Sequence, residues 1–200
     1  MKRLILGGVF AAAMAATGFA QAGDSLSALV PLTAGQTLES GNGKYMLVMQ
    51  GTDGNLVVYR KADGKVIWTT GKPAGAGAWA VVQTDKNFVV YSGPYPAHGT
   101  AAWSSGTAQA GVNDPTARLT IWPDGKLTLM TSTSQGVPYW STPGDSTVCP
   151  DGNPKTAYPI CMRPGTNYQS NSYVYACTYA QAQVLASQFV NAGAVMGTCH

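Results

Sequence analysis

The pattern of hydrophobic and polar positions repeats three times between about Ser25 and Pro143. In each repeat, two short runs rich in Val, Leu, Ile and Tyr flank a polar stretch that contains an aspartate. Each repeat then ends on a tryptophan followed by small hydroxylated residues. These tryptophans, Trp68, Trp103 and Trp140, are 35 and 37 residues apart. A period of this size indicates a repeat architecture.

Within each repeat the local chemistry is that of antiparallel hairpins. Asp-Gly pairs at 53–54 and 124–125 favour tight two-residue turns between strands. In the second repeat Lys86 replaces this glycine, so we expect a different turn type if the position needs a positive φ. A further turn follows in each repeat, as at 61–64, so each repeat predicts about four short strands. The apolar runs that flank the polar stretches are 45–50 and 56–59, 80–83 and 88–91, and 118–122 and 127–130.

Strand alternation sorts the residues of the second repeat onto two faces. Phe88 and Val90 point one way and are predicted, with Trp103, to lie in the core. Val89 and Tyr91 are predicted on the opposite, accessible face. One repeat of this size cannot bury its apolar face alone, so we expect the three repeats to pack around a shared centre. The three closing tryptophans are the expected side chains of that centre.

The accessible face of the second repeat carries the motif Gln83-x-Asp85-x-Asn87-x-Val89-x-Tyr91. Each of these residues alone is ordinary for a turn or a strand, but their spacing inside a repeat favours a sugar site. A hexose offers hydroxyls that both donate and accept hydrogen bonds, which a carboxylate, two amides and a phenol can match. Val89 is predicted to contact the apolar C–H face of the ring.

This motif resembles, at all five positions, the mannose-binding signature of the bulb-type (monocot mannose-binding) lectins, the B-lectin domain. The resemblance covers about Ser25 to Pro143 and, with the exported N-terminus described below, suggests a secreted bacterial member. It implies an all-β fold, a β-prism II of three four-stranded sheets with pseudo-threefold symmetry. It also implies binding of mannose-type sugars with no metal, no cofactor and no catalysis. Gln83, Asp85 and Asn87 would hold the axial hydroxyl side of mannose, and Tyr91 a far hydroxyl.

The other two repeats depart from the motif. In the first, the glutamine stands one residue early and Gly51 occupies its place, although an extra loop residue or a bulge would restore the side chain. The third repeat keeps only the aspartate and predicts a structural unit without a sugar site. The second candidate carbohydrate site therefore consists of Gln50, Asp53, Asn55, Val57 and Tyr59. The third-repeat equivalents are Trp122, Asp124, Lys126, Thr128 and Met130.

The first 22 residues predict a secretory signal peptide. Lys2 and Arg3 precede an apolar stretch, Leu4 to Ala16, and small residues at 20–22 provide a cleavage site. A membrane anchor is the weaker alternative, because the apolar stretch is shorter than the ~20 residues of a membrane span. No later segment is long and apolar enough for a transmembrane helix. We therefore expect a secreted or periplasmic protein after cleavage near Ala22.

A cysteine-containing C-terminal segment, 146–200, is expected after a lectin domain, 23–145. An even cysteine number in an exported chain favours two disulfides, with three connectivities open. Zinc is the alternative, but no C-x-x-C pair occurs. Disulfides are expected to staple a segment too small to fold alone. The four cysteines are Cys149, Cys161, Cys177 and Cys199.

This C-terminal segment also contains two predicted elements. Residues 172–177 predict a short strand. Thr178 and Gln181 form a capping-box pattern for one helix that runs to about Ala192. Leu185 and Phe189 are predicted to share a face with Ala192.

Charge and carboxylate content exclude other function classes. Without Lys2 and Arg3, ten basic and nine acidic residues remain, which is no electrostatic signature of nucleic-acid binding. A glycosidase usually needs a convergent carboxylate pair, whereas the chain has one glutamate, Glu39, and its repeat aspartates would be held apart. We predict no catalytic residues. The expected partners are mannose-containing glycans or polysaccharide, and the oligomeric state stays open. The alternative is a lectin-like bacteriocin or surface adhesin that uses the prism scaffold for protein or cell-envelope binding.

Overall fold

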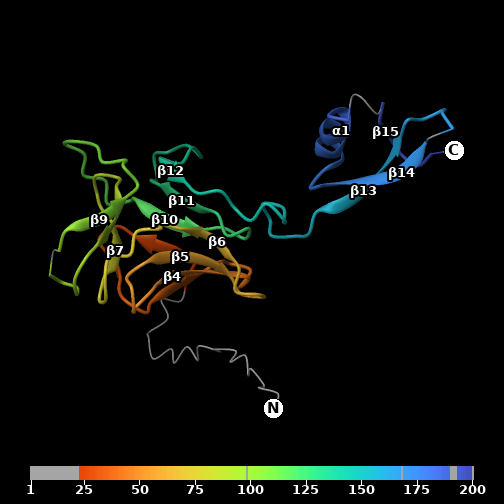
Figure 1. The fold of residues 1–200 in the computed structure, drawn as a ribbon. Coiled ribbons are helices and arrows are strands. Elements are labelled where there is room, and N and C mark those ends of the chain that lie inside the picture. The colour runs from red at the N-terminus through yellow and green to blue at the C-terminus, as the bar shows by residue number, and fades with distance from the viewer. Residues whose placement is uncertain (1–22, 98, 168, 190–192, 200) are drawn as a thin grey trace, which may run out of the picture.

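The computed structural model describes residues 23–97, 99–167, 169–189 and 193–199 (Figure 1). The predicted signal peptide lies outside these residues. No helix within them is long and apolar enough to cross a membrane. The strands of the repeat region are β1 (Ser25–Ser27), β2 (Pro31–Leu32), β3 (Thr37–Glu39), β4 (Tyr45–Met49), β5 (Leu56–Arg60), β6 (Val66–Thr69), β7 (Trp79–Val82), β8 (Phe88–Tyr91), β9 (Ala101–Ser104), β10 (Arg118–Ile121), β11 (Leu127–Met130) and β12 (Trp140–Ser141).

These twelve strands form three antiparallel four-stranded sheets, which we call the prism. Each repeat contributes three consecutive strands, in the orders β4-β5-β6, β7-β8-β9 and β10-β11-β12. The fourth strand of every sheet comes from the N-terminal stretch, because β3 pairs with β4, β2 with β7 and β1 with β10. The prediction of four strands per repeat was therefore wrong. The second turn of each repeat leads directly into the tryptophan strand, and the N-terminal stretch covers the edge left on the other side.

The centre of the prism is filled by the three closing tryptophans. Trp68, Trp103 and Trp140 contact one another edge to face, with ring centroids 5.5 to 5.7 Å apart. This is a favourable geometry for aromatic pairs. Phe88 and Val90 are fully buried in the hydrophobic core, which confirms their prediction, whereas Trp103 is partly buried and packs against that core.

The polar stretches between the hairpin strands form loops longer than the predicted two-residue turns. In the second repeat Gln83 N–H donates to the Asn87 carbonyl oxygen at 2.8 Å and so closes a loop between β7 and β8. Within this loop Asp85 Oδ1 accepts the Asn87 N–H at 3.0 Å. Asp53 and Asp124 accept the same bond in their own loops, each at 3.0 Å. The aspartate thus satisfies a backbone donor within the loop, and a β-turn remains inside it, since Lys86 N–H donates to the Gln83 carbonyl oxygen at 3.2 Å.

Lys86 adopts the backbone conformation of the glycines that it replaces. Its φ is 69°, against 69° for Gly54 and 79° for Gly125. The expected change of turn type is therefore wrong, and the second repeat carries a lysine in the left-handed region. A positive φ is unfavourable for a residue with a Cβ. The Lys86 ammonium donates to the Tyr139 hydroxyl at 2.9 Å and lies 4.4 Å from the centre of its ring, and these contacts offset part of that conformational cost.

The C-terminal residues form a smaller unit with its own hydrophobic cluster. Its sheet has the order β14-β13-β15, and the helix α1 packs on one face. Two disulfides join Cys149 to Cys177 and Cys161 to Cys199, so the predicted pair of bonds is confirmed and its connectivity is now given. The elements are β13 (Thr156–Met162), β14 (Ser170–Ala176), α1 (Tyr179–Ser187) and β15 (Val195–Met196).

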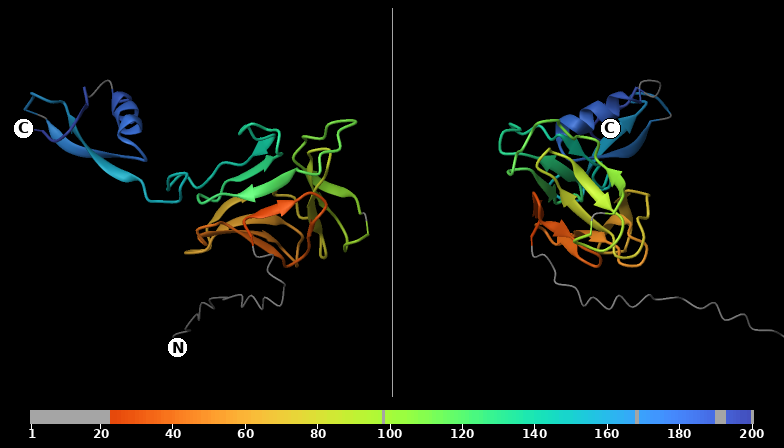
Figure 2. Two further views of the ribbon diagram at one scale, coloured as in Figure 1. Left: turned by 180° about the vertical axis from the view of Figure 1, so that it is seen from behind. Right: turned by 90° about the vertical axis from the view of Figure 1, so that its left-hand side faces the viewer.

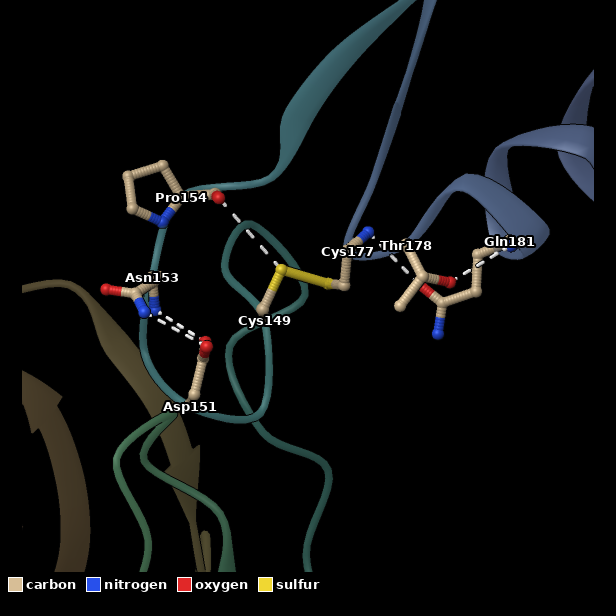
Figure 3. Close-up of a disulfide and its surroundings, with 7 residues drawn as sticks. All are labelled: Cys149, Asp151, Asn153, Pro154, Cys177, Thr178 and Gln181. Atoms are coloured by element: carbon tan, nitrogen blue, oxygen red, sulfur yellow. Dashed lines mark hydrogen bonds between the residues drawn. A yellow bond between two sulfur atoms is a disulfide. The ribbon is translucent and has the colours of Figure 1, made fainter.

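The N-terminal cap of α1 was predicted correctly, but the helix is shorter than predicted. Thr178 accepts the Gln181 N–H, and the Gln181 side chain accepts the Cys177 N–H beside the first disulfide (Figure 3). The helix ends at Ser187, and Ala192 lies outside the described residues. Its buried residues are Ala182 and Ala186, whereas Phe189 is 45% exposed. Alanines on the inner face let the helix backbone approach the sheet, and Leu185 is partly buried against the same cluster.

Residues 142–154 link the two units and pack against the prism. Lys44 Nζ donates to the Gly152 carbonyl oxygen at 2.9 Å, and Val148 contacts the prism core. The second hydrophobic cluster begins only at Tyr158. Figures 1 and 2 show the two units apart, joined by this stretch. We propose that 23–145 and 146–200 are separate domains, with the first part of the latter held on the prism surface.

Candidate carbohydrate site

The second-repeat motif extends along one sheet, from the loop between β7 and β8 to the last residue of β8. Gln83 follows β7, and Asp85 and Asn87 lie in the loop before β8. On β8, Val89 pairs with Val81, and Tyr91 pairs with Trp79. Gln83, Asp85, Asn87 and Tyr91 are all half-buried, which leaves each accessible while neighbouring atoms hold it.

Gln83 and Tyr91 are joined directly. Gln83 Nε2 donates to the Tyr91 hydroxyl at 2.9 Å. This bond restrains both side chains before any ligand arrives, which lowers the entropy cost of binding. Because the amide nitrogen of Gln83 donates to Tyr91, the amide oxygen Oε1 is the atom of this side chain that can accept a hydrogen bond from a ligand.

Asp85 and Asn87 each use one side-chain oxygen for hydrogen bonds within the protein, which leaves fewer atoms for a ligand. One carboxylate oxygen of Asp85 holds the loop, and its Oδ2 takes no hydrogen bond from the described residues. Asn87 Oδ1 accepts from Ser105 Oγ at 3.0 Å and from Thr107 N–H at 3.3 Å. Its amide Nδ2 therefore remains as the donor. The site thus presents one carboxylate acceptor and one amide donor side by side.

Ser105 and Thr107 were missed as site-supporting residues. The sequence signal was present, because each repeat has a hydroxylated residue after its closing tryptophan. Ser105 Oγ also accepts the Phe88 N–H at 2.9 Å, and Thr142 Oγ1 does the same for Leu127 N–H. The hydroxyl therefore ties the third strand of a repeat to the start of its second strand, and in the second repeat it orients Asn87.

Val89 does not lie on an accessible face, which corrects the sequence prediction. It is 3% exposed, and Val81 directly opposite is also buried. Trp79 is the diagonal neighbour on the same face, and large side chains at such positions reach one another. Val89 therefore belongs to the floor beneath the polar groups.

The first repeat reproduces this arrangement. Gln50 N–H donates to the Asn55 carbonyl oxygen at 2.9 Å, as Gln83 does to Asn87, so the extra residue is accommodated in the loop. Gln50 Nε2 then donates to the Tyr59 hydroxyl at 2.8 Å. Asn55 Oδ1 accepts from two hydroxyls, those of Thr69 and Thr70. Val57 is buried like Val89.

The third repeat has a hollow of about 300 Å³ at the corresponding place, with different chemistry. Trp122 Nε1 donates to Thr128 Oγ1 at 2.8 Å, and Met130 stands in the tyrosine position. Asp124 survives there because its Oδ1 accepts the Lys126 N–H and holds the loop. The retained aspartate therefore has a structural role, and the absence of a mannose site there stays a prediction.

A smaller hollow of about 220 Å³ lies beside the second-repeat motif. It includes Gln83 and Tyr91, and sequence analysis did not anticipate its other members. Nothing in the local pattern showed that Trp79 stacks on Tyr91, because this depends on the register of two strands. The remaining lining residues are Leu29, Trp79, Val81, Tyr95 and Pro96.

Among the residues that the structure describes, no group of three or more His, Cys, Asp or Glu side chains could hold a metal ion. All four cysteines are in disulfides.

Comparison with known proteins identifies the architecture. No protein-family model and no curated protein sequence matches the chain. Among solved structures, a Marasmius oreades lectin is similar at a TM-score of 0.50 and 24% identity, over 63% of this chain and 95% of that one. Monocot mannose-binding lectins from Gastrodia elata are similar at a TM-score of 0.49 and 27% identity, over 60% and 94%.

A Polygonatum cyrtonema lectin, complexed with monomannoside, is similar at a TM-score of 0.44 and 28% identity, over 56% of this chain and 97% of that one. The fold assignment rests on the Marasmius oreades match, together with the three four-stranded sheets. The chain therefore has a β-prism II fold, followed by a small disulfide-bonded segment with one helix.

Proposed function

We propose that this chain is a carbohydrate-binding protein, a lectin that recognises mannose-type sugars without a metal ion, a cofactor or catalysis. The observation that carries the proposal is the geometry shared by two repeats. In each, a glutamine amide donates to a tyrosine hydroxyl, at 2.9 Å for Gln83 and 2.8 Å for Gln50. In each, an asparagine is anchored through its oxygen by hydroxyls of the next strand.

The primary site uses Gln83, Asp85, Asn87 and Tyr91, with Val89 in the floor. The exposed oxygen of Asp85 accepts from a sugar hydroxyl, and such charge-assisted hydrogen bonds are the stronger kind. The Asn87 amide donates to a neighbouring hydroxyl, and Gln83 Oε1 accepts from another. An epimer with one hydroxyl misplaced would leave one of these groups unpaired, which favours one sugar over its isomers.

The first repeat provides a second site of the same design, with Gln50, Asp53, Asn55, Val57 and Tyr59. Sites on different sheets face different directions, so one chain can bind two sugars of a branched glycan or polysaccharide. Two weak sites engaged together give an avidity well above that of either one. Mannose-containing glycans or polysaccharide are therefore the proposed partners.

We also propose that the protein acts outside the cytoplasm, secreted or periplasmic after cleavage near Ala22. Its two disulfides support this, because such bonds persist in oxidising compartments.

Retention of residues 23–200, with the disulfides formed, on mannan-coated beads tests the sugar site. We expect retention that free mannose competes away, and a clear loss of retention in Asp85→Asn. The matched control is Asp151→Asn, because Asp151 Oδ1 accepts the Asn153 N–H in a loop outside the prism. Absence of retention, or retention unchanged in both Asp85→Asn and Asp53→Asn, contradicts the proposal.

A second candidate function keeps the prism as a scaffold and places the activity in protein or cell-envelope binding, as in a bacteriocin or adhesin. The exposed Tyr173, Tyr175 and Tyr179 of the C-terminal unit favour it, because exposed aromatic residues are common in interfaces. Killing of related strains by a mannose-insensitive route would support this candidate.

A further inference from the structure

The hollow beside the second-repeat motif has an aromatic wall. Trp79 stacks on Tyr91, with ring centroids 4.9 Å apart and planes at 26°. Tyr95 stands edge-on to Trp79 at 5.2 Å. Trp79 is only 3% exposed, whereas Tyr95 is 50% exposed. Trp79 therefore positions the two tyrosines, and Tyr91 and Tyr95 present the accessible surface.

Leu29 also lines the same hollow. The residue is 67% exposed, and its φ is 65°, in the region that glycine favours. A hydrogen bond from Leu29 N–H to the Val82 carbonyl oxygen at 2.8 Å fixes it beside β7. Core packing does not explain an exposed leucine, and the turn alone would be better served by glycine. Residues held in such backbone regions cluster at binding sites.

Of the three repeats as the structure describes them, only the second has the aromatic wall of Trp79 and Tyr91. The residue opposite Tyr91 is Trp79, but the residue opposite Tyr59 in the first repeat is Met46. In the third repeat Arg118 stands opposite Met130. The second repeat thus adds an apolar surface to a polar motif that it shares with the first.

We propose that the hollow of Leu29, Tyr91 and Tyr95 is a subsite for the next sugar residue of a mannose-type glycan. The inference rests on the proposed function, since the first sugar would occupy the Asp85 and Asn87 side. None of the described residues that line the hollow is charged, so its chemistry does not favour an ionic ligand. A hexose ring has an apolar C–H face for the tyrosines and hydroxyls for Gln83. The second repeat therefore binds a linked pair of hexoses in preference to one.

Calorimetric titration of the disulfide-bonded chain tests this subsite. The ligands are methyl α-mannoside, the α-linked mannobioses and 4-nitrophenyl α-mannoside, and Gln50→Ala serves as the background that removes the first-repeat site. We expect at least one mannobiose to bind about 3- to 10-fold more tightly than methyl α-mannoside, the gain of one good contact with an aromatic ring. Tyr95→Ala and Leu29→Gly should abolish this gain and change methyl α-mannoside binding less than about twofold.

Leu29→Gly guards against misfolding, because glycine adopts the positive φ without strain. Tyr173→Ala is the matched control, since it removes a similarly exposed tyrosine from the other unit. Equal affinity for mannobioses and methyl α-mannoside, still dependent on Asp85, rejects the subsite and leaves the proposed function intact. An equal gain from the nitrophenyl group rejects a sugar as its occupant. Absence of Asp85-dependent binding rejects the proposed function and the subsite together.

Discussion

Arg60 and Asp145 form an ion pair across 85 positions of sequence, with Arg60 Nη1 2.7 Å from Asp145 Oδ2. The Asp145 side chain is 1% exposed, and the Tyr45 hydroxyl donates to the same carboxylate at 3.1 Å. Arg60 also contacts Asp63 through two hydrogen bonds. The pair fastens the linking residues to the first repeat, because Asp145 comes from the former and Arg60 from β5.

This pair predicts an acid-sensitive fold. Burial disfavours the charged form of Asp145, but hydrogen bonds from Thr147, Tyr45 and Arg60 outweigh it and hold its pKa below the usual value. A carboxylate whose pKa is lowered on folding stabilises the protein above its unfolded pKa of about 4, and this contribution is lost as the pH falls through the folded pKa. Chemical denaturation should therefore show a lower free energy of unfolding at pH 3 than at pH 7.

Asp145→Asn should reduce the free energy of unfolding at pH 7 by about 1–3 kcal/mol, because it removes the charge from a buried hydrogen-bonded group. The variant should also lose less stability between pH 7 and pH 3 than the native chain does. An identical pH profile in both proteins would show that Asp145 does not contribute to the acid response.

Ser105→Ala should weaken mannose binding although Ser105 is not expected to touch the sugar. The change removes one of the two hydrogen bonds to Asn87 Oδ1 and leaves the Phe88 N–H without its acceptor, at a cost of about 1–2 kcal/mol in stability. Titration with methyl α-mannoside measures the affinity, and thermal unfolding measures the stability. Ser104→Ala, at the exposed neighbouring position, is the control and should change neither. Unaltered affinity in Ser105→Ala would mean that Asn87 needs no anchor.

Two equivalent glutamine–tyrosine pairs predict two sugar sites in each chain. Titration with methyl α-mannoside should give a stoichiometry of two. Gln50→Ala and Gln83→Ala should each reduce it to one, because each removes the restraint on its own tyrosine, and the double variant should not bind. A single site in the native chain, lost only in Gln83→Ala, would make the first repeat structural.

Two substitutions of Lys86 distinguish the effect of its backbone strain from that of its side-chain contact. Lys86→Gly and Lys86→Ala both remove the contact with Tyr139, but only glycine relieves the positive φ. We expect the glycine variant to be more stable than the alanine variant by about 1 kcal/mol in chemical denaturation. Equal stability of the two would place the strain elsewhere in the loop.

Features set by local periodicity were predictable from the sequence. The spacing of Trp68, Trp103 and Trp140 predicted a shared centre, and alternation placed Phe88 and Val90 in the core. The number of disulfides followed from the cysteine count. Each of these signals lies within one repeat or recurs at a fixed interval.

Features that depend on long-range pairing were not predictable. The strands β1, β2 and β3 are two or three residues long and carry no periodic signal, so their sheets could not be assigned. Val89 is buried because of the residues across the sheet, and Asn87 is anchored by a serine 18 residues away. The hollow at Tyr95 likewise depends on which residue stands opposite Tyr91.

The fifteen residues from Ser25 to Glu39 supply one edge to each of the three sheets. Detachment of that short stretch would bare the backbone of β4, β7 and β10 together, and unpaired strands of this kind are templates for aggregation. No repeat can therefore be excised as an autonomous module. Loss of the leading strands should collapse all three faces in a single cooperative step, however well each hairpin is formed.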